Sequence, residues 1–335
     1  MKYKVPFLDL TPFIKKNAIS IRKKIFEPFV NCEFISSNQV KIFEDSFANF
    51  CGAKYCVGTS NGLDAIKLIL AAHNISHGHE VLVPSNTFIA TWLAVSDLGA
   101  KPVPVEPSSD FNISVDLIQK AITKKTKAII CVHLYGRPCN IEALKKIAQE
   151  NKLYLFEDMA QAHGAKYFGK PVGSFGNGAA VSFYPGKNLG AAGDAGAILV
   201  NNKRIYNQLL KLRNYGSAVK YHHDVIGFNN RMDEVQAAYL NFKLPHLEKE
   251  NAHRKKIAQI YISQLKNISE LKLPCFDVNY DSVWHLFVIR VHNRDSLKRF
   301  LDKNGIQTII HYPIPPFKQK AYLAFNDLTE RFKIK

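Results

Sequence analysis

One lysine, Lys187, stands in a setting that surface lysines seldom occupy. Residues 179–184 favour a β-strand, and the turn-forming pair Pro185-Gly186 follows them directly. Surface lysines usually sit on helix faces among other charges, whereas Lys187 is flanked by Gly and Asn and by small residues that continue to Gly196. We interpret Lys187 as a nucleophile whose amine bonds an aldehyde. An exposed turn lysine is the alternative that this segment alone leaves open.

Length and composition indicate one large domain plus a smaller one. The chain has 335 residues, of which 47% are hydrophobic, and no apolar run reaches the length that spans a membrane. Residues 1–10 mix Lys, Pro and Asp and lack the apolar core of a signal peptide, so we expect a cytoplasmic protein and no membrane partner. None of the six cysteines forms a C-x-x-C pair, which favours reduced, mostly buried thiols and no metal site.

The formal net charge of +17 does not by itself indicate a nucleic-acid partner. The lysines are spread along many predicted helices, and neither an arginine-rich arm nor a run of five like charges occurs. We therefore expect no nucleic-acid binding and assign most of the charge to solvated surface. A phosphorylated cofactor and a diphosphate substrate would account for only a few of these cations.

Alternating strand-like and helix-like segments predict a large, mostly parallel sheet. Strands are expected at 55–58, 81–83, 102–105, 128–132 and 153–156, and helices at 11–30, 37–50, from 63 onward, and at 86–98, 114–122 and 141–150. In open sheets of this kind, ligands bind beyond the carboxyl ends of the strands. Asp158, Lys187 and the turn at Ser60 all follow predicted strands, so we expect them to converge.

The rest of the chain predicts a smaller α+β domain. Residues 231–266 have the pattern of a long helical stretch broken at Pro245. We place the domain boundary there, with a large domain over 1–245 and a small one over 246–335. The small domain is expected to contain strands at 284–291 and 306–310 and a helix at 295–303.

Two strand-end residues match the chemistry of pyridoxal 5′-phosphate. This cofactor needs a lysine for its aldehyde and an anion against its pyridine nitrogen, so that the ring withdraws electrons. Lys187 and Asp158 can supply these two groups. A buried carboxylate is costly unless it is paired, and a protonated pyridine nitrogen would be its partner. A helix cap or an ordinary ion pair is the alternative for Asp158.

The same cofactor also needs a phosphate cup and a flat side chain against its ring. The turn Ser60-Asn61-Gly62 precedes a predicted helix, whose free backbone N–H groups, together with Ser182, can hold a phosphate. Either Phe88 or Trp92 can stack on the ring. A plain N-cap by Ser60 and core packing of Phe88 are the structural alternatives. The four features together favour the cofactor more strongly than any one alone.

With these cofactor residues in place, the sequence resembles the DegT/DnrJ/StrS-type nucleotide-sugar aminotransferases. Nearly the whole chain takes part, and the matching segments are 58–65 (GTSNGLDA), 84–90 (PSNTFIA), 157–164 (EDMAQAHG), the Lys187 segment and 227–234 (GFNNRMDE). As a set these segments are highly specific. The resemblance implies an aspartate-aminotransferase-like α/β fold (PLP fold type I), in which a large, mostly parallel sheet domain precedes a smaller C-terminal α+β domain.

The resemblance implies a role for each matching residue. Lys187 is the catalytic residue, because it bonds the cofactor aldehyde and then moves protons. Asp158 holds the pyridine nitrogen, and Gln161 hydrogen-bonds the ring hydroxyl oxygen. The other implied cofactor contacts are Ser60, Asn61, Gly62 and Ser182 on the phosphate, Phe88 on the ring face, and His163 close by, placed to orient Asp158. In the family the Asn-x-Arg segment comes from the partner subunit, which implies a homodimer whose Asn229 reaches across to the phosphate.

The segment around Lys187 also suggests a substrate. Residues 183–191, with Gly193-Asp194 after them, resemble members that act at C3 of dTDP-3-keto-6-deoxyhexoses. The resemblance thus implies transfer of an amine from glutamate, which leaves 2-oxoglutarate, to a dTDP-3-keto-6-deoxyhexose. The product would be a dTDP-3-amino-3,6-dideoxyhexose for surface polysaccharide such as lipopolysaccharide. The residues implied for the sugar and its diphosphate are Tyr184, Lys220, Tyr221, His311 and Tyr312.

Several alternatives stay open at this stage. One is a C4 sugar aminotransferase of the same family, and another is a non-catalytic regulator that binds PLP or sugar. A dehydratase of the same fold would carry His in place of Lys187. The C4 configuration of the sugar, the amino donor and any later acylation or formylation are not determined. Residues 37–39 depart from the family's usual Gly-Pro-Glu-like run, and relatives continue beyond the position of Lys335, so natural shortness and truncation are both open.

Overall fold

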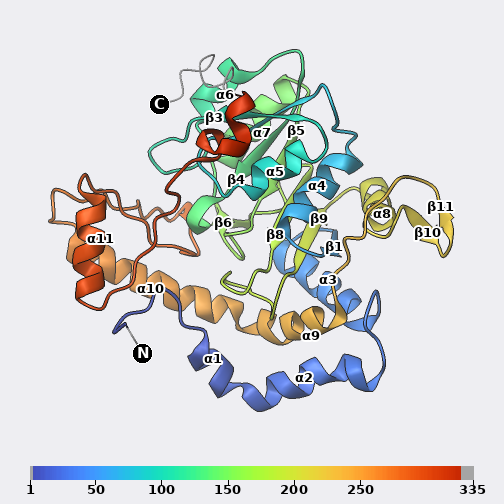
Figure 1. The fold of residues 1–335 in the computed structure, drawn as a ribbon, viewed down its shortest axis with the longest axis horizontal. Helices are drawn as coiled ribbons and strands as arrows, with labels where there is room; N and C mark the ends of the chain where they lie inside the picture. The colour runs from blue at the N-terminus through green and yellow to red at the C-terminus, as the bar shows by residue number, and fades with distance from the viewer. Residues whose placement is uncertain (1–2, 326–335) are drawn as a thin grey trace.

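A seven-stranded sheet organises the large domain in the computed structural model, which describes residues 3–325 (Figure 1). The strand order is β1-β9-β8-β5-β4-β2-β3. The strands are β1 (Tyr55–Thr59), β2 (Glu80–Pro84), β3 (Lys101–Val105), β4 (Thr126–Val132), β5 (Tyr154–Asp158), β8 (Gly178–Ser182) and β9 (Gly196–Val200). From β8 to β3 all pairs are parallel, whereas β9 is antiparallel to both of its neighbours. The predicted mostly parallel sheet is therefore confirmed.

Helices cover both faces of the sheet because neighbouring strand residues point to opposite sides. Ile129 belongs to a core cluster that also includes buried residues of α3 (Asn38–Cys51), α6 (Val115–Ala121) and α7 (Ile141–Glu150). The next residue, Ile130, belongs to a second cluster, which includes buried residues of α4 (Gly62–Ala72), α5 (Ala90–Ser96) and α8 (Lys203–Leu212) on the other face. Two hydrophobic cores result, and the sheet between them is buried on both sides, as its apolar strands predict.

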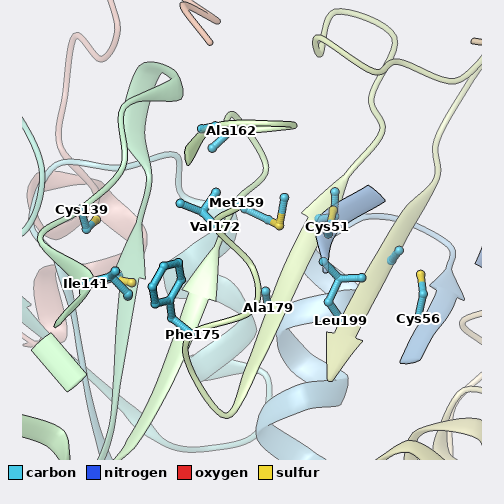
Figure 2. Packing of buried hydrophobic residues seen from close by; sticks show 14 of the residues in the cluster. Cys51, Cys56, Cys139, Ile141, Met159, Ala162, Val172, Phe175, Ala179 and Leu199 are labelled. Atoms are coloured by element: carbon cyan, nitrogen blue, oxygen red, sulfur yellow. The ribbon is translucent and has the colours of Figure 1, made fainter. Parts of the chain in front are cut away.

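Figure 2 shows part of the core on the α3 side, where Phe175, Ile141 and Met159 pack with small apolar residues. Three cysteines, Cys51, Cys56 and Cys139, point into this region without pairing. All six cysteines are free thiols; four are buried, whereas Cys32 and Cys275 are exposed. The expectation of reduced, mostly buried thiols is confirmed.

The predicted N-terminal helix is divided in two. It consists of α1 (Thr11–Lys16) and α2 (Ala18–Val30), which meet at Asn17. The long stretch after residue 231 consists of α9 (Glu234–Lys243), a 3-10 turn η2 (Leu244–His246) at Pro245 and α10 (Leu247–Leu265). The predicted break at Pro245 is confirmed. Within residues 3–325, no helix is both long and apolar enough to cross a membrane.

The small domain contains its predicted helix but not its predicted strands. α11 (Arg294–Lys303) forms as expected. Residues 284–291 and 306–310 are irregular and make one isolated bridge each, Arg290 with Lys272 and Ile306 with Val5. A strand requires a run of paired neighbours, and the described part of the chain offers each segment a partner at one position only. The strand predictions at 284–291 and 306–310 are therefore wrong in this structure.

Short elements complete the described chain. β6 (Lys166–Tyr167) pairs with both β7 (Lys170–Pro171) and β12 (Tyr280–Asp281), and β10 (Ser217–Val219) pairs with β11 (His222–His223). A 3-10 turn η1 (Leu134–Gly136) follows β4. At the end, η3 (Pro316–Lys318) and η4 (Lys320–Phe325) return to the large domain, where the Tyr322 ring lies 5.1 Å from that of Trp92. The domain division at 245/246 stays a prediction, and residues 326–335 lie outside the described chain.

Candidate active site

The sheet register brings three predicted site segments to the same end of the central strands. Asp158 ends β5 beside Ala180 of β8, two residues before Ser182. In β9, Gly196 lies between Ser182 of β8 and Thr59 of β1, the residue before the Ser60 turn. The expected convergence of Asp158, the Ser60 turn and the Lys187 segment is thus a consequence of strand pairing.

Two glycines allow the close packing of the Ser60 turn. A β-carbon on Gly62 would stand 2.6 Å from the Ser182 Cβ, and one on Gly196 would stand 2.3 Å from the Asn61 carbonyl oxygen. Real contacts of this kind do not occur, so only glycine fits at either position. The start of α4 therefore lies directly against the end of β8, which places Ser182 beside the first backbone N–H groups of that helix.

The N-cap of α4 is Asn61 rather than Ser60. The Asn61 side chain accepts a hydrogen bond from the Asp64 amide at 2.9 Å, and its own amide donates to the Asp64 carboxylate at 2.9 Å. Ser60 Oγ also donates to Asp64, whose charge is balanced by Lys67 Nζ at 2.9 Å. The structural alternative of capping by Ser60 is therefore wrong. The remaining free N–H groups of the first turn form an anion-binding helix start.

Asp158 is a buried carboxylate with two neutral donors. Thr91 Oγ1 donates to Oδ2 at 2.9 Å, and the Ala160 amide donates to Oδ1 at 3.1 Å. Burial raises the pKa of Asp158, and these two hydrogen bonds and the nearby Lys187 charge only partly oppose that effect. A buried carboxylate in this state favours a cationic partner such as a protonated ring nitrogen.

Lys187 occupies a tight turn after β8, in which its amide donates to the Tyr184 carbonyl at 2.8 Å. Burial lowers the pKa of the Lys187 amine to about 8, although the nearby Asp158 charge acts in the opposite direction. An amine with this pKa is partly neutral near pH 7 to 8, and only the neutral form is nucleophilic. The sequence-based alternative of an exposed turn lysine does not describe this side chain.

Gln161, Tyr312 and Phe88 are brought together as the sequence predicts. The Gln161 Oε1 accepts from the Tyr135 amide at 2.7 Å, which leaves its Nε2 to donate to the Tyr312 hydroxyl at 3.1 Å. The Phe88 ring lies 6.0 Å from the Tyr312 ring and is 56% exposed, so it is not a core residue. The Tyr135 hydroxyl donates to the His311 carbonyl at 2.6 Å, which ties the segment 311–312 to the large domain.

His163 contacts Ser182 rather than Asp158. Its Nε2 lies 2.9 Å from the Ser182 carbonyl oxygen and must donate to it, whereas its buried Nδ1 has no partner within the described chain. Burial and the nearby Lys187 charge lower the pKa of His163 to about 3, so the ring is neutral. Orientation of Asp158 by His163, implied by the resemblance, is not seen, because Thr91 and Ala160 hold that carboxylate.

The remaining predicted residues lie on exposed surface. Tyr184 is 59% exposed at the start of the lysine turn. Lys220 and Tyr221 lie on the β10–β11 hairpin, which projects at the right of Figure 1, with the Lys220 Nζ 5.1 Å from the Tyr221 ring centre. Asn229 is exposed and bridges to Asn214. A contact of these residues with a substrate or a partner subunit stays a prediction.

Two site features were not predicted from the sequence. One is Thr91, the hydroxyl donor to Asp158. The other is a buried network next to Lys187, in which the Asn188 amide donates to Asn251 Oδ1 at 2.9 Å and its oxygen accepts from His285 Nδ1 at 3.1 Å. The position of Asn188, directly after Lys187, was the only sequence signal for this network.

These residues fit pyridoxal phosphate. The fit rests on a buried carboxylate hydrogen-bonded by two neutral donors, an amine of lowered pKa, a histidine nitrogen without a partner in the described chain and a glycine-lined helix start. Each feature costs free energy in isolation, and each becomes favourable with a phosphorylated pyridine aldehyde in place. Among residues 3–325, no group of three or more His, Cys, Asp or Glu side chains is arranged to hold a metal ion.

Comparisons with known proteins agree with this arrangement. The chain is 48% identical over 319 residues to the dTDP-3-amino-3,6-dideoxy-alpha-D-galactopyranose transaminase of Aneurinibacillus thermoaerophilus, covering 95% of this chain and 88% of the relative. It is 43% identical over 320 residues to the dTDP-3-amino-3,4,6-trideoxy-alpha-D-glucose transaminase of Streptomyces venezuelae, covering 95% and 84%. The crystal structure of S. venezuelae DesV in complex with a ketimine intermediate superposes with a TM-score of 0.94 at 42% identity, covering 98% of this chain and 90% of that one. Residues 22–333 match the model of a family described as DegT/DnrJ/EryC1/StrS aminotransferases, and the chain belongs to that family.

Proposed function

We propose that this aminotransferase uses pyridoxal 5′-phosphate to move an amino group from glutamate to C3 of a dTDP-3-keto-6-deoxyhexose. One observation carries the proposal: the Lys187 amine, whose pKa is lowered to about 8, lies near enough to the buried Asp158 carboxylate that their charges interact. A protein that only binds a ligand needs no such amine. The substrate class follows the names of the two transaminases to which the chain is 48% and 43% identical.

Each residue has a defined task in this reaction. When bound, the cofactor supplies an electron sink for the carbon that loses or gains a proton. Lys187 binds the cofactor aldehyde, and as a free amine it takes the proton from the α-carbon of glutamate and later returns one to C3 of the sugar. Asp158 keeps the pyridine nitrogen protonated, and Gln161 holds the ring hydroxyl. The cup of Ser60, Asn61, Gly62 and Ser182 holds the phosphate, and Phe88 covers the ring.

The two substrates use the same site in turn, which predicts ping-pong kinetics. Glutamate delivers the amine and leaves as 2-oxoglutarate before the keto sugar binds. Tyr312 lies next to Gln161 and Phe88, and His311 directly precedes it, so these two residues are the best-placed candidates for the sugar. We assign Tyr184, Lys220 and Tyr221 to the nucleotide diphosphate, because aromatic and cationic side chains suit a base and a phosphate.

We further propose a cytoplasmic homodimer that acts in nucleotide-sugar biosynthesis for surface polysaccharide. Helix α2 supports the dimer, since it leaves Ile19, Phe26, Phe29 and Val30 between 48% and 88% exposed. Apolar side chains gathered on one short helix mark an interaction surface. In the dimer, Asn229 would complete the phosphate cup of the partner.

The test follows the cofactor absorption in each half-reaction separately. The stable amino sugar nucleotide dTDP-3-amino-3,6-dideoxygalactose should convert the loaded protein to the amine form of the cofactor, and glutamate should do the same. Lys187→Ala should lower both rates by several orders of magnitude, because the proposed base is lost. Lys146→Ala, which changes an exposed lysine of α7, is the matched control. Near-normal rates in Lys187→Ala would refute the mechanism.

The alternatives give different results in the same assay. A C4 aminotransferase would place the new amine on C4 of the sugar, which NMR of the product of the forward reaction resolves. A non-catalytic regulator would bind cofactor or sugar nucleotide, but glutamate would leave the absorption spectrum of the cofactor unchanged. Assay of both keto epimers, made in situ by an isomerase, decides between the gluco and galacto configurations.

A further inference from the structure

A short segment before α1 lies against the small domain. We define residues 4–8 as the N-terminal strap. The Gly305 carbonyl accepts from the amides of Lys4 at 2.8 Å and Val5 at 3.0 Å, and the Gln307 amide donates to the Val5 carbonyl at 2.9 Å. Figure 1 shows this blue segment near α10 and α11, remote in sequence from both. The strap is therefore fixed to the small domain by its backbone.

Gly305 makes this attachment possible. It follows α11 with a φ of +78°, a conformation that favours glycine. A β-carbon there would stand 3.2 Å from the Lys4 Cγ and 3.4 Å from the Lys4 amide nitrogen. The close approach of the strap to the end of α11 thus depends on the absence of a side chain at this position.

The strap then reaches two segments of the proposed active site. The Phe7 amide donates to the Gln307 Oε1 at 3.0 Å, and the Phe7 ring stacks on the His311 imidazole at 5.8 Å between centres and 19° between planes. The Leu8 side chain lies against the lysine turn, since a β-carbon on Gly186 would stand 3.4 Å from its Cδ2. One short segment therefore touches the small domain, His311 and the turn that carries Lys187.

The Phe7–His311 pair lies at the rim of the site. Phe7 is 37% exposed, and His311 is partly buried, near enough to Lys187 that the lysine charge helps to lower its pKa. Behind it, the His311 carbonyl is held by the Tyr135 hydroxyl at 2.6 Å. The imidazole is thus held on one face by an aromatic ring and through its backbone by the large domain.

We propose that Phe7 is a positioning residue for the larger substrate, because it holds the His311 imidazole where a sugar nucleotide enters the site. This inference rests on the proposed function. A nucleotide sugar extends well beyond its reacting carbon and must pass the rim, whereas glutamate is small and reacts next to Lys187. Loss of the Phe7 ring therefore affects the sugar-nucleotide half-reaction and spares the glutamate half-reaction.

The first experiment compares half-reactions of the cofactor-loaded protein. In Phe7→Ala, the concentration of dTDP-3-amino-3,6-dideoxygalactose that gives half-maximal rate should rise about threefold to tenfold. This factor corresponds to the free energy of one aromatic stacking contact. The concentration of glutamate that gives half-maximal rate should stay within about twofold of the wild-type value. Phe7→Tyr, which keeps the ring, should restore the wild-type value. Val5→Ala is the matched control, because Val5 contacts the small domain through its backbone and its side chain is 46% exposed.

A second readout does not depend on turnover. In the wild-type protein, burial and the Lys187 charge lower the pKa of His311. Removal of the Phe7 ring opens one imidazole face to water, so the His311 titration followed by NMR should move upward in Phe7→Ala and remain unchanged in Val5→Ala. His311→Gln assigns the signal among the twelve histidines. An unchanged titration in Phe7→Ala would overturn the inference.

The two hypotheses fail in different ways. If the wild-type protein reacts with glutamate but with no amino or keto sugar nucleotide, the proposed function fails and the inference fails with it. If the wild-type protein reacts with both substrates and Phe7→Ala matches Val5→Ala in both half-reactions, only the inference is overturned. An equal loss in both half-reactions would also overturn it, since that result indicates a general structural defect.

Discussion

At the scale of single residues, the site contains buried ionisable groups whose charged forms are disfavoured by burial. Burial raises the pKa of Asp158, lowers that of Lys187 to about 8 and lowers that of His163 to about 3. Burial disfavours the charged form in each case, which is why an acid and two bases shift in opposite directions. Such opposed shifts among neighbouring groups are typical of proton-transfer sites.

The lowered pKa of Lys187 predicts a pH-dependent stability for the cofactor-free protein. An unfolded lysine keeps its proton up to about pH 10.5, whereas the folded protein releases it near pH 8. Between these values the unfolded chain binds more protons, so stability rises with pH there, and below pH 8 the full cost of the buried charge is present. Relative to Lys187→Met, the wild-type protein should gain about 1–3 kcal/mol from pH 7 to pH 10.5. Urea unfolding of both proteins across that range measures the difference, and a constant gap would contradict the prediction.

Single-residue prediction from the sequence worked where a chemical group stood in an unusual local setting. Lys187 in a Pro-Gly turn and Asp158 at the end of an apolar strand are visible without a structure. Thr91 is not, because its partner Asp158 lies 67 residues away and no neighbouring residue indicates the contact. The role of His163 was misjudged for the same reason, since the sequence does not specify which of several nearby acceptors a ring nitrogen will meet.

At the scale of elements, the contact between α4 and β8 shapes the phosphate cup. A methyl group on Gly62 would meet the Ser182 Cβ at 2.6 Å. Gly62→Ala should therefore push the start of α4 from the sheet, destabilise the protein by about 1–3 kcal/mol as other overpacked cores do, and weaken cofactor binding. Unfolding curves and fluorescence titration with pyridoxal phosphate measure the two effects.

A second substitution separates steric crowding from other effects of the alanine. In Gly62→Ala/Ser182→Gly the opposing β-carbon is absent, so most of the lost stability should return, with Ser182→Gly alone as the reference. Cofactor affinity is not expected to return fully, because Ser182 is itself a proposed phosphate contact. A double variant as unstable as Gly62→Ala would show that the crowding does not come from Ser182.

Element prediction succeeded in the large sheet and failed in the small domain for one physical reason. Buried parallel strands carry their own signal as apolar runs, and β2, β4 and β5 follow it. Residues 284–291 carry a similar run, yet a strand also needs a neighbour to pair with, and pairing is not encoded locally. The antiparallel direction of β9 likewise depends on its neighbouring strands and could not be predicted from its own residues.

At the scale of the whole molecule, the described chain leaves exposed side chains that a second subunit is proposed to cover. Asn229 is exposed, and the neighbouring β10–β11 hairpin extends from the large domain (Figure 1). On α2, Phe26 and Val30 are 60% and 70% exposed. A two-fold dimer that buries these side chains would use the same patch on both subunits, and each subunit could then complete the site of the other.

Shared sites predict that two inactive variants restore each other. Lys187→Ala lacks the base, and Asn229→Ala should bind the cofactor phosphate poorly, so both are tested at limiting pyridoxal phosphate. If Asn229 acts in the partner's site, a mixed dimer has one site with both changes and one intact site. Random exchange of subunits makes half of the dimers mixed, so the mixture should recover about a quarter of wild-type activity. If Asn229 acts within its own subunit, each site of a mixed dimer carries one change and nothing is recovered. Subunit exchange, confirmed by native mass spectrometry of differently tagged variants, ensures that a negative result counts against the shared site.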